Sequence, residues 1–283
     1  MIRLVTIIVL AILSASLQAQ VLFPNKDVWE VFISQDFDAN IVRAKEGNAE
    51  AQYLVARALL FGNETLRVEA DQDQGLYWMK AAAEQGAAEA LYALAVLYRK
   101  GIAVDKDPAS WEKFMTKAGE QGLLSAMTDL VNVYRYGMPE LGMDSDQEQY
   151  LYWLEKTAES GQVFSIVNMA ITYRQGLGVD KDLGKSFEWL KRAVEQDDLS
   201  ALGMMGEYYE KGMVVDQDLV TAYMMYDLSG STPNKPRDKV AKKMTDAQIR
   251  EAIARSWQWQ VERESYRPTS KGYHYRYPLD AND

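Results

Sequence analysis

The chain has 283 residues, of which 48% are hydrophobic and 11% aromatic, so it is long enough to bury an extensive core. It contains no cysteine, which excludes disulfides and thiolate metal sites, and its formal net charge of −10 disfavours binding to nucleic acid or to anionic membranes. The single histidine, His274, excludes a multi-histidine zinc site and a Ser-His nucleophile of the usual kind.

Residues 1–19 have the pattern of a secretory signal peptide. Arg3 precedes an apolar run at residues 4–13, and small residues lead to a plausible cleavage point at Ala19. A membrane anchor needs roughly 20 apolar residues, so this run is short for one, although an uncleaved anchor remains the alternative. We expect a mature protein that starts near Gln20, is exported to a bacterial periplasm and is not stably inserted in the membrane.

Residues 20–46 do not match the rest of the chain but have a helical pattern. Their apolar side chains recur at helical spacing: Trp29, Phe32, Ile33, Phe37, Ile41 and Val42. We expect N-terminal capping helices here, because the first repeat of an array has a neighbour on one side only.

Residues 47–230 contain five copies of one phrase. An aspartate recurs at spacings of 36, 39, 36 and 36 residues, as Asp71, Asp107, Asp146, Asp182 and Asp218. A glycine recurs as Gly62, Gly101, Gly137, Gly176 and Gly212, each fifteen residues after the residue that opens its copy: Gly47, Gly86, Gly122, Gly161 and Asp197. Self-similarity at this period is typical of a helical solenoid.

Each copy is predicted to form two antiparallel helices, which we name the A helix and the B helix. The A helices are expected at residues 49–61, 89–100, 125–136, 164–175 and 200–211, and the glycine after each suits a left-handed C-terminal cap. Each B helix is expected to start at the recurring aspartate, whose carboxylate accepts amide hydrogens of the first turn. Pro108, in the first helical position after Asp107, supports this register.

Three phrases resemble the Sel-one-like repeats, which are related to the tetratricopeptide repeats. They are residues 47–54 (GNAEAQYL), 78–86 (WMKAAAEQG) and 173–182 (YRQGLGVDKD). The resemblance covers about two thirds of the chain and implies an all-α, right-handed α/α superhelical solenoid of about five two-helix repeats. Two copies depart from the pattern with loops three residues longer, at residues 63–70 and 138–145, and the last copy has Met225 in place of an aromatic residue.

Residues 231–283 have a different composition. A turn-rich break at residues 231–236 precedes a helix expected from Thr245 or Asp246 to about Glu264, which would cap the far end of the array. Beyond it lies an aromatic and basic tail, for which disorder and docking are both open. This region carries 11 Lys or Arg against 7 Asp or Glu, a net charge of +4, so the whole negative excess lies in the first 230 residues.

Candidate catalytic and metal sites have weak support. Ser110 and Lys113 match the Ser-x-x-Lys motif of penicillin-recognising enzymes, but the partner motifs are missing. Paired aspartates, such as Asp105 with Asp107, have the spacing to share calcium, but one member of each pair is already explained as a helix cap. We therefore expect no enzyme activity, no cofactor and no metal.

The face of the A helices that is turned away from the array is the predicted binding site. In a superhelix this face lines the concave groove, as the resemblance also implies, and it carries aromatic, aliphatic and arginine side chains that are frequent in interface hot spots. The predicted partner-binding residues are Tyr53, Arg57, Tyr92, Val96, Arg99, Asn132, Arg135, Tyr136, Phe164, Ile171 and Arg174. The alternative for the arginines is pairing with neighbouring acidic residues, which would only stabilise the groove.

These features predict a non-enzymatic, protein-binding solenoid. Such repeats serve as protein-binding scaffolds in envelope regulation, secretion and immunity against antibacterial effectors, so the resemblance implies protein binding. Our sharper hypothesis is an immunity or regulatory protein that binds and inhibits a periplasmic protein. A structural adaptor of an envelope or secretion complex is the alternative, and a cell-wall fragment receptor or enzyme is a weaker one. The acidic body favours a basic client, such as an enzyme, toxin or sensor domain, and disfavours nucleic acid.

Overall fold

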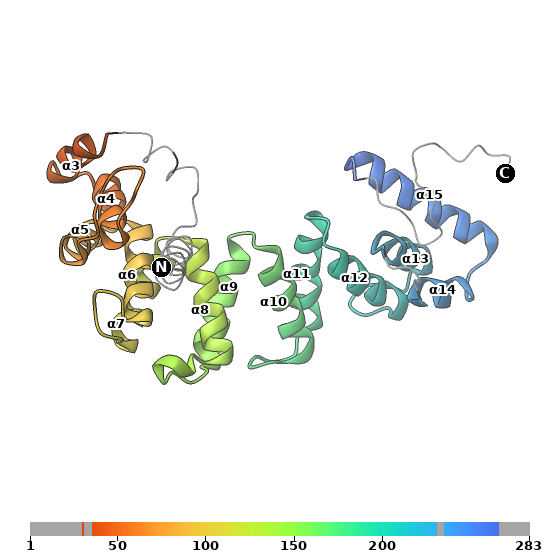
Figure 1. Cartoon of the computed structure of the whole chain (residues 1–283). Coiled ribbons are helices and arrows are strands. Elements are labelled where there is room, and N and C mark those ends of the chain that lie inside the picture. The colour runs from red at the N-terminus through yellow and green to blue at the C-terminus, as the bar shows by residue number, and fades with distance from the viewer. Residues whose placement is uncertain (1–29, 31–35, 231–234, 266–283) are drawn as a thin grey trace, which may run out of the picture. The chain divides into compact units, whose positions relative to one another are not determined.

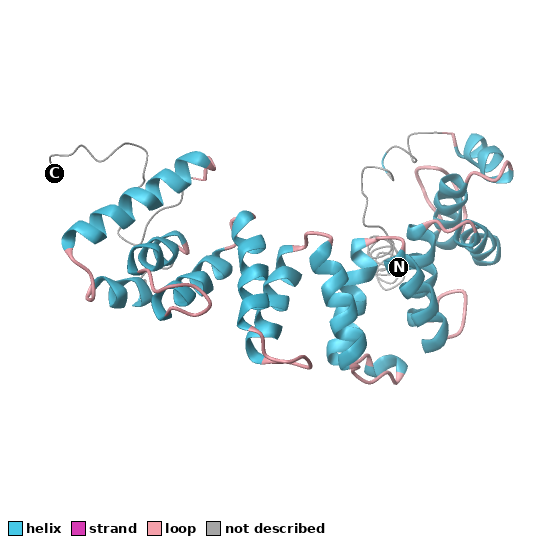
Figure 2. Cartoon of the chain, turned by 180° about the vertical axis from the view of Figure 1, so that it is seen from behind, coloured by secondary structure: helices cyan, strands magenta, loops and turns pink. Residues whose placement is uncertain are grey.

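The computed structural model describes residue 30, residues 36–230 and residues 235–265. Within these residues the chain forms thirteen α-helices and no strand, which confirms the predicted all-α solenoid (Figures 1 and 2). The predicted signal peptide, most of the N-terminal capping segment and the C-terminal tail lie outside the described residues. None of the described helices combines the length and the apolar character needed to span a bilayer.

The chain divides into two compact units, Met1–Trp153 and Leu154–Asp283, and the boundary falls inside α9 (Gln147–Glu159). The other helices of the first unit are α3 (Phe37–Lys45), α4 (Ala49–Phe61), α5 (Gln72–Glu84), α6 (Ala88–Lys100), α7 (Pro108–Glu120) and α8 (Leu124–Tyr136). Those of the second unit are α10 (Val163–Gln175), α11 (Leu183–Glu195), α12 (Leu199–Lys211), α13 (Leu219–Leu228), α14 (Lys235–Ala241) and α15 (Asp246–Glu262). Consecutive helices pack in pairs, such as α4 with α5, α6 with α7, α10 with α11 and α12 with α13.

The predicted A helices correspond to α4, α6, α8, α10 and α12. All five end at the predicted residue, and four begin one residue earlier than predicted. The recurring aspartates cap the B helices as expected. Their Oδ1 atoms accept backbone N–H groups of the first turn: Asp71 from Gln74 (3.0 Å), Asp107 from Ala109 (3.2 Å), Asp146 from Gln149 (3.0 Å), Asp182 from Lys185 (2.9 Å) and Asp218 from Thr221 (3.0 Å).

The glycine cap prediction is right in three copies and wrong in two. Gly101, Gly176 and Gly212 adopt the left-handed helical conformation. Gly62 and Gly137, which precede the two longer loops, instead have ψ values of 162° and 176° at positive φ, a region open almost only to glycine. The extended ψ turns each loop back on itself, so that Asn63 pairs with Val68 and Met138 with Met143 as isolated antiparallel bridges.

The C-terminal region holds one predicted helix and one missed helix. The predicted helix is α15, and it begins with a capping box in which Thr245 and Gln248 bond each other's backbone amides. Helix α14 was missed because its first two residues were assigned to the turn-rich break. The proline ring suits the first turn of a helix, so Pro236 is compatible with α14 and does not end it.

Two glycines of α12 provide a matched stability test. A Cβ on Gly206 would lie 2.8 Å from ring atoms of Tyr226, whose hydroxyl is held by Glu210 at 3.0 Å. A Cβ on Gly203 would meet nothing closer than Ser229 at 3.8 Å. We expect Gly206→Ala to lower the free energy of unfolding by about 1–2 kcal/mol through overpacking. Gly203→Ala is expected to raise it by up to about 1 kcal/mol through helix propensity. Urea unfolding followed by circular dichroism measures both, and equal stability of the two variants would contradict this account.

Candidate partner-binding face

The predicted face of the A helices is partly buried and partly open. In the first unit, the predicted residues on α4 and α6 are buried except for the half-buried Arg99, whereas those on α8 are exposed. In the second unit, Phe164 is exposed and Ile171 and Arg174 are half-buried. The two units are described separately below.

Four predicted residues are not surface groups. Tyr53, Arg57, Tyr92 and Val96 are only 7%, 6%, 8% and 3% exposed, which contradicts the expectation that they lie outside the core. For Tyr92 the cause is a contact with the next A helix, because its hydroxyl donates a 3.0 Å hydrogen bond to Asp129 of α8. An A helix in an array contacts its own B helix and also neighbouring A helices. The part of its surface that stays exposed is therefore narrower than the helical pattern of a single repeat predicts.

Burial also changes the acid–base properties of these groups. It raises the pKa of the Tyr53 phenol and, together with the charge of Asp129, that of the Tyr92 phenol. Burial likewise raises the pKa of the Asp129 carboxyl above its usual value and lowers that of the Arg57 guanidinium to about 9. Arg57 therefore remains a cation at neutral pH, inside the fold and not on an open groove wall.

The open stretch of the first unit is on α8. Asn132, Arg135 and Tyr136 are exposed there, Tyr136 by 69%. The Arg135 guanidinium lies 5.2 Å from the ring centre of Tyr136 and 5.6 Å from that of Tyr150, and it forms no ion pair with the described residues. Arg135 and Tyr136 thus present a stacked cation–aromatic pair to solvent.

Two other predicted arginines, Arg99 and Arg174, are paired with acidic residues. Arg99 Nε lies 3.7 Å from Glu140, and Arg174 donates a 2.6 Å hydrogen bond to Glu207 of α12. The alternative of neighbouring acidic partners therefore holds for Arg99 and Arg174. It does not hold for Arg135 within the described part of the chain.

In the second unit, the same face is open at Phe164, which is 64% exposed, and it continues to a cavity on α12. We name this cavity the α12 hollow. Its volume is about 500 Å³, and its lining comes from α12, α13, α14 and the residue after α13: Ser200, Gly203, Met204, Glu207, Glu210, Lys211, Tyr226, Ser229, Pro236 and Lys239.

Two carboxylates of the hollow are already bonded. Glu210 accepts hydrogen bonds from Lys243 (2.8 Å) and Tyr226 (3.0 Å), and Glu207 from Arg174 (2.6 Å) and Lys211 (2.5 Å). Burial by itself raises the pKa of each carboxyl, but these donors lower the pKa below its usual value. Both glutamates therefore stay ionised at neutral pH.

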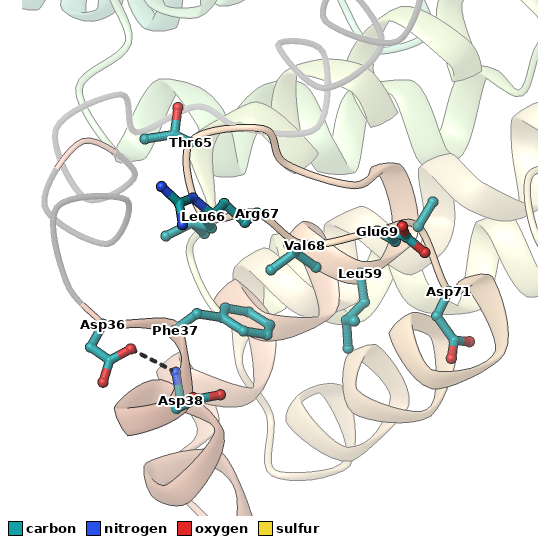
Figure 3. A pocket seen from close by; sticks show the side chains of 11 residues that line it. Asp36, Phe37, Asp38, Leu59, Thr65, Leu66, Arg67, Val68, Glu69 and Asp71 are labelled. Atoms are coloured by element: carbon teal, nitrogen blue, oxygen red, sulfur yellow. Dashed lines mark hydrogen bonds between the residues drawn. The ribbon is translucent and has the colours of Figure 1, made fainter.

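The first unit also contains a cavity of about 740 Å³ between the start of α3 and the loop at residues 63–70 (Figure 3). The Phe37 ring points towards Val68 and Leu59, and the rim is acidic. Two of the rim carboxylates have structural roles, because Asp36 caps α3 and Asp71 caps α5. Among the described residues, no group of three or more histidine, aspartate or glutamate side chains is placed to hold a metal ion.

Sequence reasoning missed the α12 hollow. One local signal was present, because the sixth residue after the opening residue is Tyr53, Tyr92, Thr128 and Val167 in the first four copies but Gly203 in the last. Of the other lining residues, Tyr226 comes from α13 and Pro236 and Lys239 from α14, and α14 itself was not predicted.

Comparison with known proteins agrees with this architecture. The family model described as Sel1 repeat matches five segments, residues 49–86, 88–123, 126–162, 163–198 and 199–231, which together exceed half of the chain. No curated protein matches the chain.

Several solved structures are similar. The protective antigen c5321 of uropathogenic Escherichia coli, which displays an SLR fold, is 28% identical over 82% of this chain, with a TM-score of 0.51. The match covers 49% of that protein, so this chain spans about half its length. A Sel1 repeat protein from Oxalobacter formigenes is 27% identical over 65% of this chain and 73% of that one, with a TM-score of 0.50. The immunity protein Pa5087 from Pseudomonas aeruginosa is 17% identical over 79% and 83% of the two chains, but its TM-score of 0.34 is too low to support an argument.

Proposed function

The chain belongs to the Sel1 repeat family, whose solenoids mediate protein–protein interactions, and from this premise we propose that it is a non-enzymatic, exported protein that binds and inhibits a periplasmic protein. The inhibited protein would be a secreted antibacterial effector, with this chain as its immunity protein, or an envelope sensor. The proposal of export rests on the signal-peptide pattern of residues 1–19.

One observation supports the proposal most strongly. Each unit exposes an aromatic side chain on the face of its A helices, Tyr136 at 69% and Phe164 at 64%, whereas Trp111 and Trp153 are fully buried. An exposed tyrosine stacked with an arginine is the kind of residue pair that dominates interface energies. The acidic body would steer a basic client towards the chain.

The binding test compares two double variants. Tyr136→Ala/Phe164→Ala removes the aromatic groups of the predicted face, and Tyr77→Ala/Tyr152→Ala removes two exposed tyrosines from B helices as the control. Hot-spot side chains typically contribute about 2 kcal/mol or more each, which corresponds to roughly a 30-fold change in affinity. We expect the first variant to lose affinity for the client by at least about two orders of magnitude and the control to change it by less than about threefold.

The client is to be captured with the tagged chain from periplasmic extract and identified by mass spectrometry. Inhibition is tested by assaying the captured client with and without the chain. A client that keeps full activity in the complex would indicate an adaptor and overturn the inhibitory role. Equal binding by both double variants would overturn the assignment of the face. Cell fractionation checks export, and full-length protein retained in the cytoplasm would contradict it.

A further inference from the structure

Helix α12 contains a glycine that packing does not require. Gly206 is explained by the Tyr226 ring, which leaves no room for a Cβ. Gly203 has room for one, because the nearest atom, Ser229 Cβ, would lie 3.8 Å away, and its φ is not in the positive region. A glycine inside a helix costs about 1 kcal/mol relative to alanine. Gly203 lies in the lining of the α12 hollow, and because it has no side chain it leaves open space there.

The lining of the hollow suits an apolar side chain. Around Gly203, the half-buried Met204, the ring of Tyr226 and the exposed Pro236 present apolar atoms. An inserted methyl-bearing or aromatic group would exclude water from these surfaces. The other lining residues are polar or charged, and clefts that combine apolar atoms with polar groups that fix orientation are typical ligand sites.

The charges around the hollow are unlike those of the body. Arg174, Lys211, Lys239 and Lys243 surround Glu207 and Glu210, which leaves a surplus of two positive charges. The lysine side chains are 55%, 72% and 47% exposed, in the order Lys211, Lys239 and Lys243.

The two carboxylates do not offer a site for a basic group. Glu210 is 8% exposed and its oxygens are bonded to Lys243 and Tyr226, while Glu207 is bonded to Arg174 and Lys211. An ammonium group carries three donors, so Lys211, Lys239 and Lys243 retain donors for a bound anion. Charge complementarity therefore favours carboxylates over cations at the rim.

We infer that the α12 hollow is a docking site for an acidic protein segment with an apolar side chain. The apolar side chain occupies the space over Gly203, and carboxylates on either side of it meet Lys211, Lys239 and Lys243. This inference rests on the proposed function, because the hollow continues the same face of the A helices, and it adds the chemistry of the segment that this end of the face recognises.

The test uses the whole chain and a phage-displayed library of random dodecapeptides. Peptides selected on the chain are expected to combine aspartate or glutamate with at least one leucine, isoleucine, methionine or phenylalanine. The tightest peptide, labelled with fluorescein, is then titrated with each variant and followed by anisotropy. Failure to enrich any peptide, or enrichment of basic peptides, would overturn the inference.

Four variants separate the effect of shape from the effect of charge. Gly203→Leu fills the hollow and is expected to weaken binding at least tenfold, whereas Gly203→Ala changes it by less than about threefold. Lys239→Glu reverses a charge at the rim and is expected to weaken binding at least fivefold. Lys80→Glu, the same charge change on the exposed side of α5, is the control and should leave the affinity unchanged within about twofold. Affinity should also fall as salt is raised.

The outcomes distinguish this inference from the proposed function. Because Lys239 is an exposed side chain, Lys239→Glu provides the test even if Gly203→Leu disturbs the fold. Wild-type affinity of the peptide for Lys239→Glu overturns the inference. A periplasmic client that is lost by Tyr136→Ala/Phe164→Ala but retained by Gly203→Leu and Lys239→Glu would overturn the inference and leave the proposed function standing.

Discussion

Trp153→Ala is expected to lower the free energy of unfolding by about 3–5 kcal/mol, because it removes one of the largest fully buried side chains of the fold. The Trp153 ring, 1% exposed, lies on Gly119 of α7 so closely that a Cβ there would come within 2.7 Å of it. Truncation would leave a cavity between α7 and α9. In a repeat array each repeat is stabilised by contacts with its neighbours, so the lost packing directly weakens the contact between α7 and α9.

The neighbouring residue provides the control for this substitution. Tyr152 is in the same helix and its ring packs edge-on against Trp153 at 5.1 Å, but it is 45% exposed. Tyr152→Ala should cost less than about 1 kcal/mol, because much of its surface is already in water. Urea unfolding followed by far-ultraviolet circular dichroism measures both variants. Similar losses for the two would show that the interface around Gly119 is not a closely packed core.

Arg237→Ala is expected to destabilise the second unit by about 3–5 kcal/mol, because it removes one partner of a buried ion pair. Arg237 Nη1 lies 3.0 Å from Asp227 Oδ1, and the two side chains are only 5% and 3% exposed. The guanidinium also bonds Asp238 at 2.7 Å and lies 5.7 Å from the ring centre of Tyr223. The contacts with Asp227 and Tyr223 attach α14 to α13, next to the apolar cluster formed by Val220, Ala222, Tyr223, Tyr226, Val240 and Ala252.

Two further variants test the cause of that loss. The double variant Arg237→Leu/Asp227→Leu removes both charges and should recover much of the stability, since most of the cost comes from the carboxylate left buried without this arginine. Arg255→Ala breaks an ion pair with Glu251 in which both side chains are about half exposed, and it should cost less than about 1 kcal/mol. Equal losses for Arg237→Ala and Arg255→Ala in urea unfolding would contradict the buried-pair argument.

The helices and their ends were predictable from the sequence because local chemistry decides them. A carboxylate that accepts amide hydrogens of the next turn fixes where each B helix starts, and this holds at all five recurring aspartates. The period of the repeat then places these local signals in register, which is enough to predict the fold class. The cap prediction failed at Gly62 and Gly137, because the longer loops that follow them, residues 63–70 and 138–145, fold back on the glycine.

The burial of the candidate site was not predictable in the same way. Tyr92 and Phe164 both belong to the predicted face, yet Tyr92 is 8% exposed and Phe164 is 64% exposed. The difference depends on contacts with other repeats, such as the bond from Tyr92 to Asp129, 37 residues away. A helical pattern assigns faces within one repeat and contains no information about how much of a face the neighbouring repeats cover.

The sequence by itself determined the all-α repeat architecture, the register of the ten repeat helices and the residues that cap the B helices. Only the tertiary structure decided which predicted residues are open to a partner and where the face is hollow. The α12 hollow needs Gly203 of α12, Tyr226 of α13 and Lys239 of α14. Helix α14 was not predicted, because its first two residues were assigned to the proline-containing break. Such a site arises from side chains far apart in the chain, and their proximity follows from the packing of whole helices, which local periodicity does not specify.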